Sequence, residues 1–475
     1  MTTSNLFAGR ELLSESNLHK VFSSELGGSL SLEPRAESAS ISADGVKEML
    51  GSWRAAIERE AVALARLAPS ALTDLPPGCL YEHQDQPDWL LAAQACEIFR
   101  NPIVSKNAGR LDVKALQRNI RDWLGRDGEP TLVIGWGQPK RSAGGLKAFG
   151  PYADLAEMYA IGRLLVIVKA LEKVAARPIK LAVLTGGSRF FEAFFTRPEL
   201  TLRYDQQRQT IADALAGPGV IEFQAYSQAV GDGGHTAISG ERAVKFRQAL
   251  AGVSDEMAAA KFGTVLLNVD WEHIFAPDPA QRQKAPHGLP LPDSVAAWLA
   301  TGDANRLVRA AVTSLISPRH QAACLDMIGS ETVLEDAISF IQSVAWESTR
   351  KYIALHLMDG GDETAGASEA SGRNALRLTV HEKDKLRDMP AIFTLGPRGG
   401  NQLSQHVLAM VGERGETVFG AYAEFWAGPA RAVRLEPQGD YPVFAWLAES
   451  GQPLCLSSVA DEALLQALCR ASAAA

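Results

Sequence analysis

An alternation of short aliphatic runs with helical segments, between residues 131 and 226, constrains the fold more than any other feature of this sequence. Three runs rich in aliphatic residues adjoin glycines, and they are Thr131–Ile134, Ile179–Thr185 and Val220–Tyr226. Helical segments that begin near Asp154 and Glu199 separate them. Strands separated by helices pair in parallel and carry the helices on their faces. The sequence therefore predicts an α/β fold, with a Rossmann-like mixed sheet flanked by helices.

Segments on both sides of this alternation extend the predicted organisation. Apolar residues recur at helical spacing over Lys47–Leu67 and Trp89–Phe99, which predicts a helical N-terminal extension. A capping-box pattern at Thr332–Glu335 opens a long helix, and Thr264–Val269 is a further predicted strand. The predicted division of the chain is a mobile tail over residues 1–40, the helical extension over 41–125, and an α/β catalytic domain over 126–475 with a flexible loop at 359–373.

The last quarter of the chain predicts a C-terminal β-rich part. The predicted strands are residues 375–381, 391–395, 406–411 and 416–425. The last two flank Gly412-Glu-Arg-Gly415, which is typical of a hairpin loop.

Composition and charge exclude several classes of protein. The 475 residues carry a formal net charge of -8, whereas a broad nucleic-acid grip needs a basic face. The five cysteines show no CxxC spacing, which favours reduced thiols and a cytoplasmic location. Residues 1–10 lack the pattern of a secretory signal, and Arg163 and Lys169 interrupt the most apolar helix. We therefore expect a cytoplasmic protein with no nucleic-acid or membrane partner.

A glycine-rich loop after the first predicted strand is one candidate for chemistry. It runs from Gly135 to Lys147 and carries Lys140 and Arg141. Ligands of open α/β sheets bind at the carboxyl ends of strands, and freed backbone N–H groups together with cations suit a phosphate or a carboxylate. The alternative is a solvated basic loop, because the segment is neither a Walker A loop nor a dinucleotide fingerprint.

A second candidate lies in the predicted strand at 375–381. Alternation places Arg377, Thr379 and His381 on one face, where the arginine could hold an anion and the histidine could exchange protons. The alternative is a half-exposed strand with a polar outer face. His406 is a third candidate, although a lone histidine at the start of a strand is usually a surface or capping residue. Nine histidines and five cysteines show no metal-ligand spacing, so we expect no metal and no cofactor.

Three segments, in order, resemble the isocyanide (isonitrile) synthases, the pyoverdine/dityrosine biosynthesis proteins. Leu132-Val-Ile-Gly-Trp-Gly-Gln-Pro-Lys140, followed by Leu146-Lys147 and Asp154-Leu-Ala-Glu157, is similar to the family's strand, G-F-P-F-K-S loop, second lysine and P-D-L-x-E helix start. Leu184-Thr-Gly-Gly-Ser-Arg-Phe-Phe-Glu192 resembles S-D-G-x-x-F-x-D, and a helix with Tyr204-Asp205 follows. Leu376-Arg-Leu-Thr-Val-His381 resembles I-R-L-S-I-H, and Leu403-Ser-Gln-His406 stands where T-P-W-H is expected.

The resemblance implies a metal-free, cofactor-free synthase that joins the amine of an amino acid to ribulose 5-phosphate and leaves one sugar carbon as an isocyanide. Its partners would be these two small molecules and a downstream oxygenase of the same pathway. The residues that it implies are Lys140, His381 and His406 for catalysis, and Lys147, Arg377, Arg141, Ser188 and Glu157 for substrate binding.

Two departures from the family pattern leave other functions open. Gly186 replaces the aspartate of S-D-G, and the T-P-W of T-P-W-H is altered. A transferase dependent on S-adenosylmethionine or a nucleotide could instead use Gly135-Trp-Gly137 as its glycine turn, although no acidic residue opens that loop. A non-catalytic member of the family, acting as a binding protein, is the third possibility.

Overall fold

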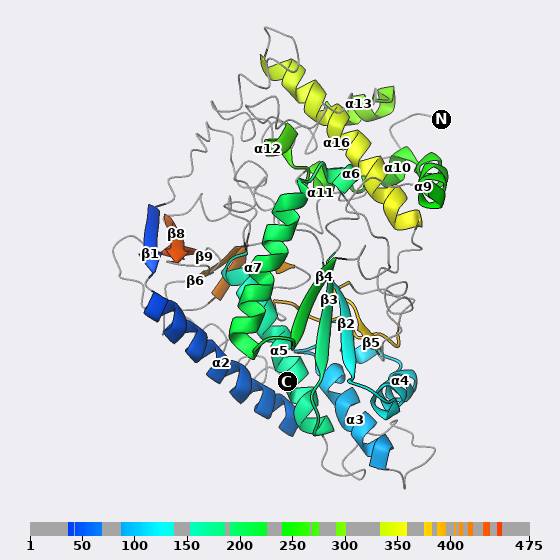
Figure 1. Cartoon of the computed structure of the whole chain (residues 1–475). Helices are drawn as coiled ribbons and strands as arrows, with labels where there is room; N and C mark the ends of the chain where they lie inside the picture. The colour runs from blue at the N-terminus through cyan, green and yellow to red at the C-terminus, as the bar shows by residue number, and fades with distance from the viewer. Residues whose placement is uncertain are drawn as a thin grey trace.

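The computed structural model describes a central parallel sheet, helices packed against it, a second group of helices and several short C-terminal strands (Figure 1). The residues that it describes are 37–41, 43–68, 87–136, 153–185, 191–225, 240–266, 268–274, 291–300, 333–358, 375–381, 387–395, 403–404, 408–411, 417–420, 431–437 and 444–448. The predicted tail up to residue 36 and the predicted loop at 359–373 lie outside these residues.

The central sheet has four strands, and all of its pairings are parallel. Its order is β4-β3-β2-β5. The strands are β2 (Thr131–Trp136), β3 (Lys180–Thr185), β4 (Ile221–Ala225) and β5 (Ala375–Leu378). The predicted α/β class and the parallel pairing of the first three strands are confirmed, although the predicted mixed sheet is parallel throughout these four strands.

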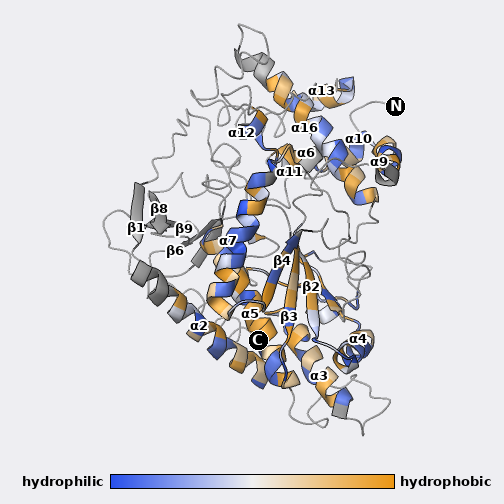
Figure 2. Ribbon diagram, in the orientation of Figure 1, coloured by the Kyte–Doolittle hydropathy of each residue, from blue (hydrophilic) through white to orange (hydrophobic). Residues whose placement is uncertain are grey.

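The two inner strands are aliphatic because both of their faces are covered. Leu132 and Ile134 of β2 belong to the main hydrophobic core on one face. Val133, Ala182 and Leu184 form a smaller buried cluster on the other face. Figure 2 shows the resulting band of hydrophobic residues along the strands. Burial on both faces explains the continuous aliphatic runs, which are typical of parallel sheets.

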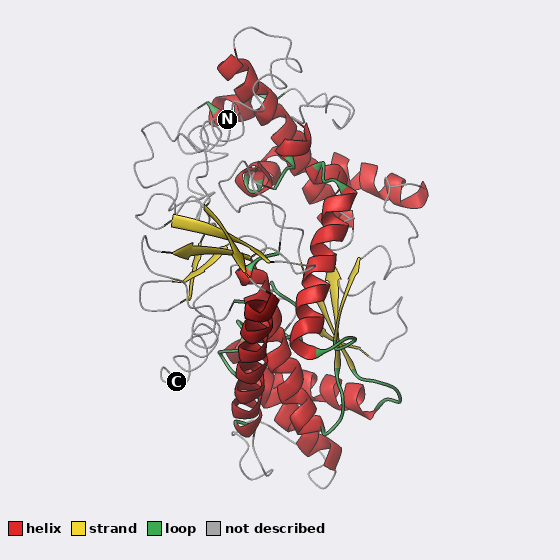
Figure 3. Ribbon diagram, turned by 60° about the vertical axis from the view of Figure 1, so that its left-hand side comes forward, coloured by secondary structure: helices red, strands yellow, loops and turns green. Residues whose placement is uncertain are grey.

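The helices of the main core are α2 (Ala43–Arg66), α3 (Pro87–Arg100), α4 (Val113–Gly125), α5 (Leu155–Ala175) and α7 (Pro198–Ala216). Asp154 caps α5 as predicted, since its carboxylate accepts a hydrogen bond from the Ala156 amide at 2.9 Å. α5 packs against α2, α3 and α7 and is buried on nearly every side. Figure 3 shows a group of helices side by side next to the strands. The buried Arg163, which interrupts the apolar helix α5, donates a hydrogen bond to the Ile103 carbonyl at 2.6 Å. This bond offsets part of the cost of burying its guanidinium group.

A second hydrophobic cluster lies in the other helical part of the molecule. Its helices are α6 (Phe191–Phe194), α9 (Gly240–Ala251), α10 (Asp255–Ala259), α11 (Phe262–Leu266), α12 (Trp271–Ile274), α13 (Asp293–Leu299) and α16 (Val333–Met358). α16 confirms the long helix predicted there, whereas Thr332 lies outside the described residues. α7 extends from this cluster toward the sheet (Figure 1).

The strand predicted at Thr264–Val269 is wrong, because helix α11 includes its first three residues and the backbone turns at Asn268. Phe262, Val265 and Leu266 are all buried, and their spacing fits one side of a helical turn packed against α16. The Leu266 carbonyl accepts a hydrogen bond from the Trp271 indole at 2.8 Å. A short apolar run cannot be assigned to strand or helix by periodicity alone, and tertiary packing decides its conformation here.

The C-terminal strands are described by their backbone pairing. β6 (Leu408–Val411) and β7 (Thr417–Gly420) pair antiparallel, as the predicted hairpin requires. β1 (Glu37–Ile41), β8 (Arg431–Pro437) and β9 (Phe444–Ala448) form a three-stranded sheet. The strand predicted at 391–395 is reduced to two bridges, from Ala391 to Thr379 and from Ile392 to Ser105. No helix in the described part of the chain is long and apolar enough to cross a membrane.

Candidate functional site

The three segments that resemble isocyanide synthases begin on neighbouring strands of one sheet. β2 pairs with β3 on one side and with β5 on the other, in parallel. Their carboxyl ends therefore lie at the same edge of the sheet, where open α/β proteins bind ligands. Trp136 ends β2, Thr185 ends β3, and His381 follows β5 by three residues. The candidates Lys140, Arg141, Lys147, Ser188 and His406 lie outside the described residues.

A buried ionic cluster stands at this edge on the helical face of the sheet. We call it the Asp205–Arg208 cluster, and it comprises Thr185, Tyr204, Asp205, Arg208 and Glu157. Asp205 and Arg208 form an ion pair one turn apart on α7. The Thr185 hydroxyl donates to the other Asp205 oxygen at 2.8 Å. Two donors from different elements therefore hold this carboxylate, whose side chain is 16% exposed.

Arg208 is the most deeply enclosed charge of the cluster, with a side chain that is 0% exposed. Its guanidinium carbon lies 4.5 Å from the ring centroid of Tyr204, 4.8 Å from that of Phe223 and 5.7 Å from that of Trp136. Burial alone lowers the pKa of Arg208, but the neighbouring Asp205, Tyr204 and Glu157 outweigh it, and the net pKa is raised. The arginine therefore remains a fixed positive charge that holds the end of β2 against α7.

Tyr204 and Glu157 connect this cluster to the start of α5. The Tyr204 hydroxyl donates a hydrogen bond to Glu157 Oε1, and both side chains are buried. Burial and the adjacent Glu157 carboxylate raise the pKa of Tyr204 well above its usual value, so the phenol stays protonated. Glu157 Oε2 and two guanidinium nitrogens of Arg208, Nε and Nη1, have no hydrogen-bond partner among the described residues. The cluster thus retains one acceptor and two donors.

The polar residues of β5 lie on the opposite face of the sheet. Leu376, Leu378 and Val380 are buried, whereas Arg377 and Thr379 are half-buried and His381 is exposed, which confirms the predicted alternation. Arg377 is paired in register with Val133, whose side chain belongs to the smaller cluster on the other face of the sheet. Glu157 and Arg377, both predicted to bind substrate, therefore approach the carboxyl edge from opposite faces. The Thr379 hydroxyl accepts from the His381 amide at 3.1 Å and donates to the His381 carbonyl at 3.0 Å.

Lys106 also lies at the end of β5, although sequence reasoning did not identify it. Its Nζ donates to the Val380 carbonyl at 2.8 Å and stands 5.7 Å from the centroid of the Phe393 ring. Burial lowers the pKa of the Lys106 ammonium to about 8. We call Lys106, Thr379 and His381 the β5-end cluster. A lysine with these surroundings holds a carbonyl or phosphate group, or acts as an amine.

Replacing Lys106 with methionine is expected to change how stability depends on pH. The pKa of Lys106 falls from 10.5 to about 8 in the folded protein, so between these values the unfolded chain binds more protons at this residue. The free energy of unfolding of the native protein therefore rises with pH across this window. Below about pH 8 the ammonium is charged in both states, and the folded protein bears the whole free-energy cost of burying it. The free energy of unfolding of the variant, relative to the native protein, should fall between pH 8 and 10. Urea unfolding at several pH values measures this, and a difference that does not change with pH would contradict it.

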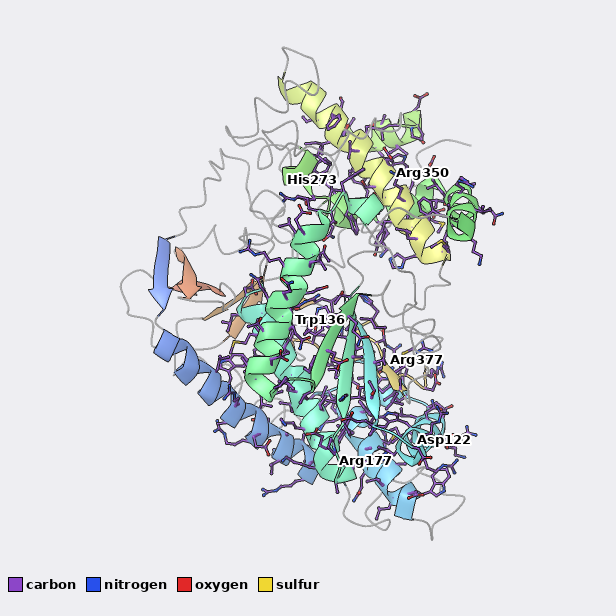
Figure 4. All side chains as sticks on the ribbon, viewed as in Figure 1. Asp122, Trp136, Arg177, His273, Arg350 and Arg377 are labelled. Carbon is purple, nitrogen blue, oxygen red and sulfur yellow. The ribbon has the colours of Figure 1, made fainter. Side chains whose placement is uncertain are left out.

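The polar groups of the second helical cluster have structural partners. Arg197 Nε contacts Asp270 Oδ2 at 3.1 Å, and Asp270 Oδ1 also accepts from the His273 amide at 3.3 Å. His273 Nδ1 lies 2.9 Å from the Phe195 carbonyl. Figure 4 shows His273 and Arg350 in this cluster, whereas Trp136 and Arg377 lie beside the sheet. These contacts indicate a structural role for Asp270 and His273.

The prediction that the protein needs no metal remains a prediction. Within the described ranges, no group of three His, Cys, Asp or Glu side chains is placed to hold a metal ion. The segments that follow β2 and β3 are not among those residues.

Sequence reasoning overlooked Lys106 and Arg208 for different reasons. Lys106 is 274 positions from the carbonyl that it contacts, and no local pattern signals such a contact. Arg208 had a local signal, because Tyr204, Asp205 and Arg208 lie on adjoining positions of one helix at spacings of three and four. An ion pair on a helical face that also carries the buried Ile211 and Leu215 indicates a buried polar network.

Comparison with known proteins finds similarity among solved structures. No protein-family model matches the chain, and no curated protein matches it. The crystal structure of the PvcA protein from Pseudomonas aeruginosa is similar to the chain, with 13% sequence identity and a TM-score of 0.43. The similarity covers 75% of this chain and 100% of that chain. The assignment of a function therefore depends on the sequence segments of this chain and on where its fold places them.

Proposed function

We propose that this protein is an isocyanide-synthase-like enzyme that condenses the amine of an amino acid with ribulose 5-phosphate. The observation that carries the proposal is the adjacency of β2, β3 and β5, because each begins or contains a segment that resembles the family. Thr131 of β2 and Ala375 of β5, which pair in register, are 244 positions apart in the sequence. Their parallel pairing makes one carboxyl edge out of three distant segments.

The residues at this edge suit the two proposed substrates. Ribulose 5-phosphate carries a phosphate and an amino acid carries a carboxylate, and both need cationic partners. Arg377 is described on β5, and Lys140 and Lys147 follow β2 in the sequence. Imine formation and enolisation need a group that exchanges protons near neutral pH, and His381 is the described candidate. Glu157 Oε2 has no hydrogen-bond partner among the described residues, which supports a role in accepting a hydrogen bond from an ammonium group.

The test is incubation of the purified protein with an aromatic amino acid and uniformly carbon-13-labelled ribulose 5-phosphate. We expect an isonitrile product that carries a single labelled carbon, detected by mass spectrometry and by the isonitrile infrared band. Product formation should survive prior treatment with a chelator. Product that disappears on chelation and returns with zinc or iron would contradict the metal-free part of the proposal, and thermal stabilisation by S-adenosylmethionine instead of ribulose 5-phosphate would favour the transferase.

A pair of arginine variants separates a role at the site from a general effect on the fold. Arg377→Gln removes the described cation of β5 and should lower kcat/KM roughly 10- to 100-fold, as expected for losing a hydrogen bond to a charged group. Arg350→Gln is the matched control, because Arg350 pairs with Asp255 at 3.0 Å in the second helical cluster. Equal activity of the two variants would contradict the placement of substrate at the end of β5.

A further inference from the structure

Lys106 differs from the other lysines with described contacts, because no acidic partner is found for it in the part of the chain that the structure describes. Lys180 contacts Glu129 at 2.8 Å and Lys351 contacts Glu347 at 2.6 Å, and Lys173 pairs with Glu58. Among the described residues, the polar contact of the Lys106 ammonium is the Val380 carbonyl, with the Phe393 ring nearby. A lysine used only to stabilise a surface would keep its ammonium in water or beside a carboxylate.

The backbone around Lys106 fixes the start of this side chain at the end of β5. The Lys106 amide donates to the Ala391 carbonyl at 2.7 Å, and the Ile392 amide donates to the Thr379 carbonyl at 2.7 Å. The segment at 391–393 thus joins Lys106 to β5 by hydrogen bonds on both of its sides. The neighbouring Asn107 side chain donates to the Met389 carbonyl at 3.0 Å and accepts from the Ala391 amide at 2.9 Å. A fixed backbone places the amine next to the residue that precedes His381.

We propose that Lys106 is a further catalytic residue, whose amine forms an imine with the ketone of a ketose phosphate bound at the end of β5. This inference rests on the proposed function and adds to it a covalent step through the enzyme. The Lys106 nitrogen attacks the carbonyl carbon, a C–N bond forms, and the carbonyl oxygen leaves as water to give a C=N bond. The amine of the amino acid then adds to the same carbon and displaces Lys106, which regenerates the free lysine. No oxidant or reductant is consumed.

The surroundings of Lys106 support this role in two ways. Only the neutral amine is a nucleophile, and burial lowers the pKa of Lys106 to about 8, so an appreciable fraction is neutral near physiological pH. Arg377 lies on the same strand face as Thr379 and His381, and it offers a positive charge for the phosphate of the same sugar.

The experiment traps the imine in the full-length protein. The protein is incubated with ribulose 5-phosphate and sodium cyanoborohydride, digested, and mapped by mass spectrometry for a reduced sugar-phosphate adduct. We expect the adduct on the peptide with Lys106, at an occupancy at least tenfold above that of Lys351, the internal control with a carboxylate partner. Competition by unlabelled inorganic phosphate should reduce the labelling, because the sugar is held by its phosphate.

Two variants complete the test. Lys106→Arg keeps a positive charge and a hydrogen-bond donor but cannot form an imine, so it should lose the adduct and lower kcat about 100-fold or more. Lys106→Met should likewise lose the adduct and have a lower kcat. Thermal unfolding verifies that each variant is folded. Full turnover by Lys106→Arg, or an adduct on another lysine while Lys106 stays unlabelled, would overturn the inference. If the native protein makes no isonitrile but is still labelled at Lys106, the proposed function is contradicted and the imine site is supported. If the native protein makes isonitrile but carries no label at Lys106, the proposed function is supported and the imine site is contradicted.

Discussion

Replacing Asp205 with asparagine is expected to lower the free energy of unfolding by about 3 kcal/mol. The substitution hardly changes the shape of the side chain but removes its charge. Arg208, whose side chain is 0% exposed, would then stay buried without its ion-pair partner. Its Nε and Nη1 already lack hydrogen bonds among the described residues, and of the carboxylates that raise its pKa only Glu157 would remain. Breaking a buried pair on one side costs far more than the pair contributes as a whole, because one charge is left uncompensated.

The double variant Asp205→Asn/Arg208→Met is the matched control. It removes both charges and leaves an apolar side chain among the rings of Tyr204, Phe223 and Trp136. We expect it to be more stable than Asp205→Asn alone, since a buried pair replaced by apolar groups is often neutral. Chemical unfolding followed by tryptophan fluorescence measures all of the variants. A loss below about 1 kcal/mol for Asp205→Asn, the range of an exposed pair, would show that Arg208 is solvated in solution.

Much of the sheet could be predicted from the sequence, because its strands carry a local signal. The aliphatic runs at β2 and β3 are buried on both faces and are bounded by glycine, so their limits agree with the structure within two residues. The cap at Asp154 was equally local, since an N-cap depends on contacts within one turn. The incorrect strand prediction at α11 also came from a local signal. A run of a few apolar residues is compatible with a strand or a helix, and only its packing partners decide between them.

The site was less predictable because its contacts join segments that are distant in the sequence. Alternation correctly placed Arg377, Thr379 and His381 on one face of β5, but it gave no indication that Lys106 reaches the same strand end. The family resemblance pointed to Glu157 and to Tyr204-Asp205 as separate features. The structure joins them through the hydrogen bond from Tyr204 to Glu157, which spans 47 positions.

The two clusters at the carboxyl edge differ in their burial and in their charge pairing. The Asp205–Arg208 cluster on the helical face is enclosed and charge-paired, which suits a group that fixes the ends of β2 and β3. The β5-end cluster is more open, with an exposed histidine and a lysine that has no described acidic partner. Proton exchange and covalent chemistry need accessible groups of this kind, whereas precise positioning needs the enclosed ones.

Replacing Trp136 with alanine should have the other large effect, a loss of about 3–5 kcal/mol in the free energy of unfolding. Trp136 ends β2, is fully buried, and packs 6.1 Å from the centroid of the Phe223 ring. Its removal leaves a cavity at the point where β2 passes into the glycine-rich loop that carries Lys140. It also removes one of the rings that surround the Arg208 guanidinium. We therefore expect lost activity at temperatures where the variant is still folded.

Trp346→Ala is the control for this prediction, because Trp346 is equally buried but belongs to the second helical cluster. Both alanine variants should lose a similar amount of stability, since they remove the same side chain from a packed interior. Their activities should differ: Trp346→Ala should keep near-native kcat/KM below its unfolding temperature, and Trp136→Ala should not. Trp136→Phe, which retains an aromatic ring, should recover most of the lost stability and most of the lost activity. If both alanine variants keep full activity while folded, the end of β2 does not position the site, and the glycine-rich loop acts independently of the Asp205–Arg208 cluster.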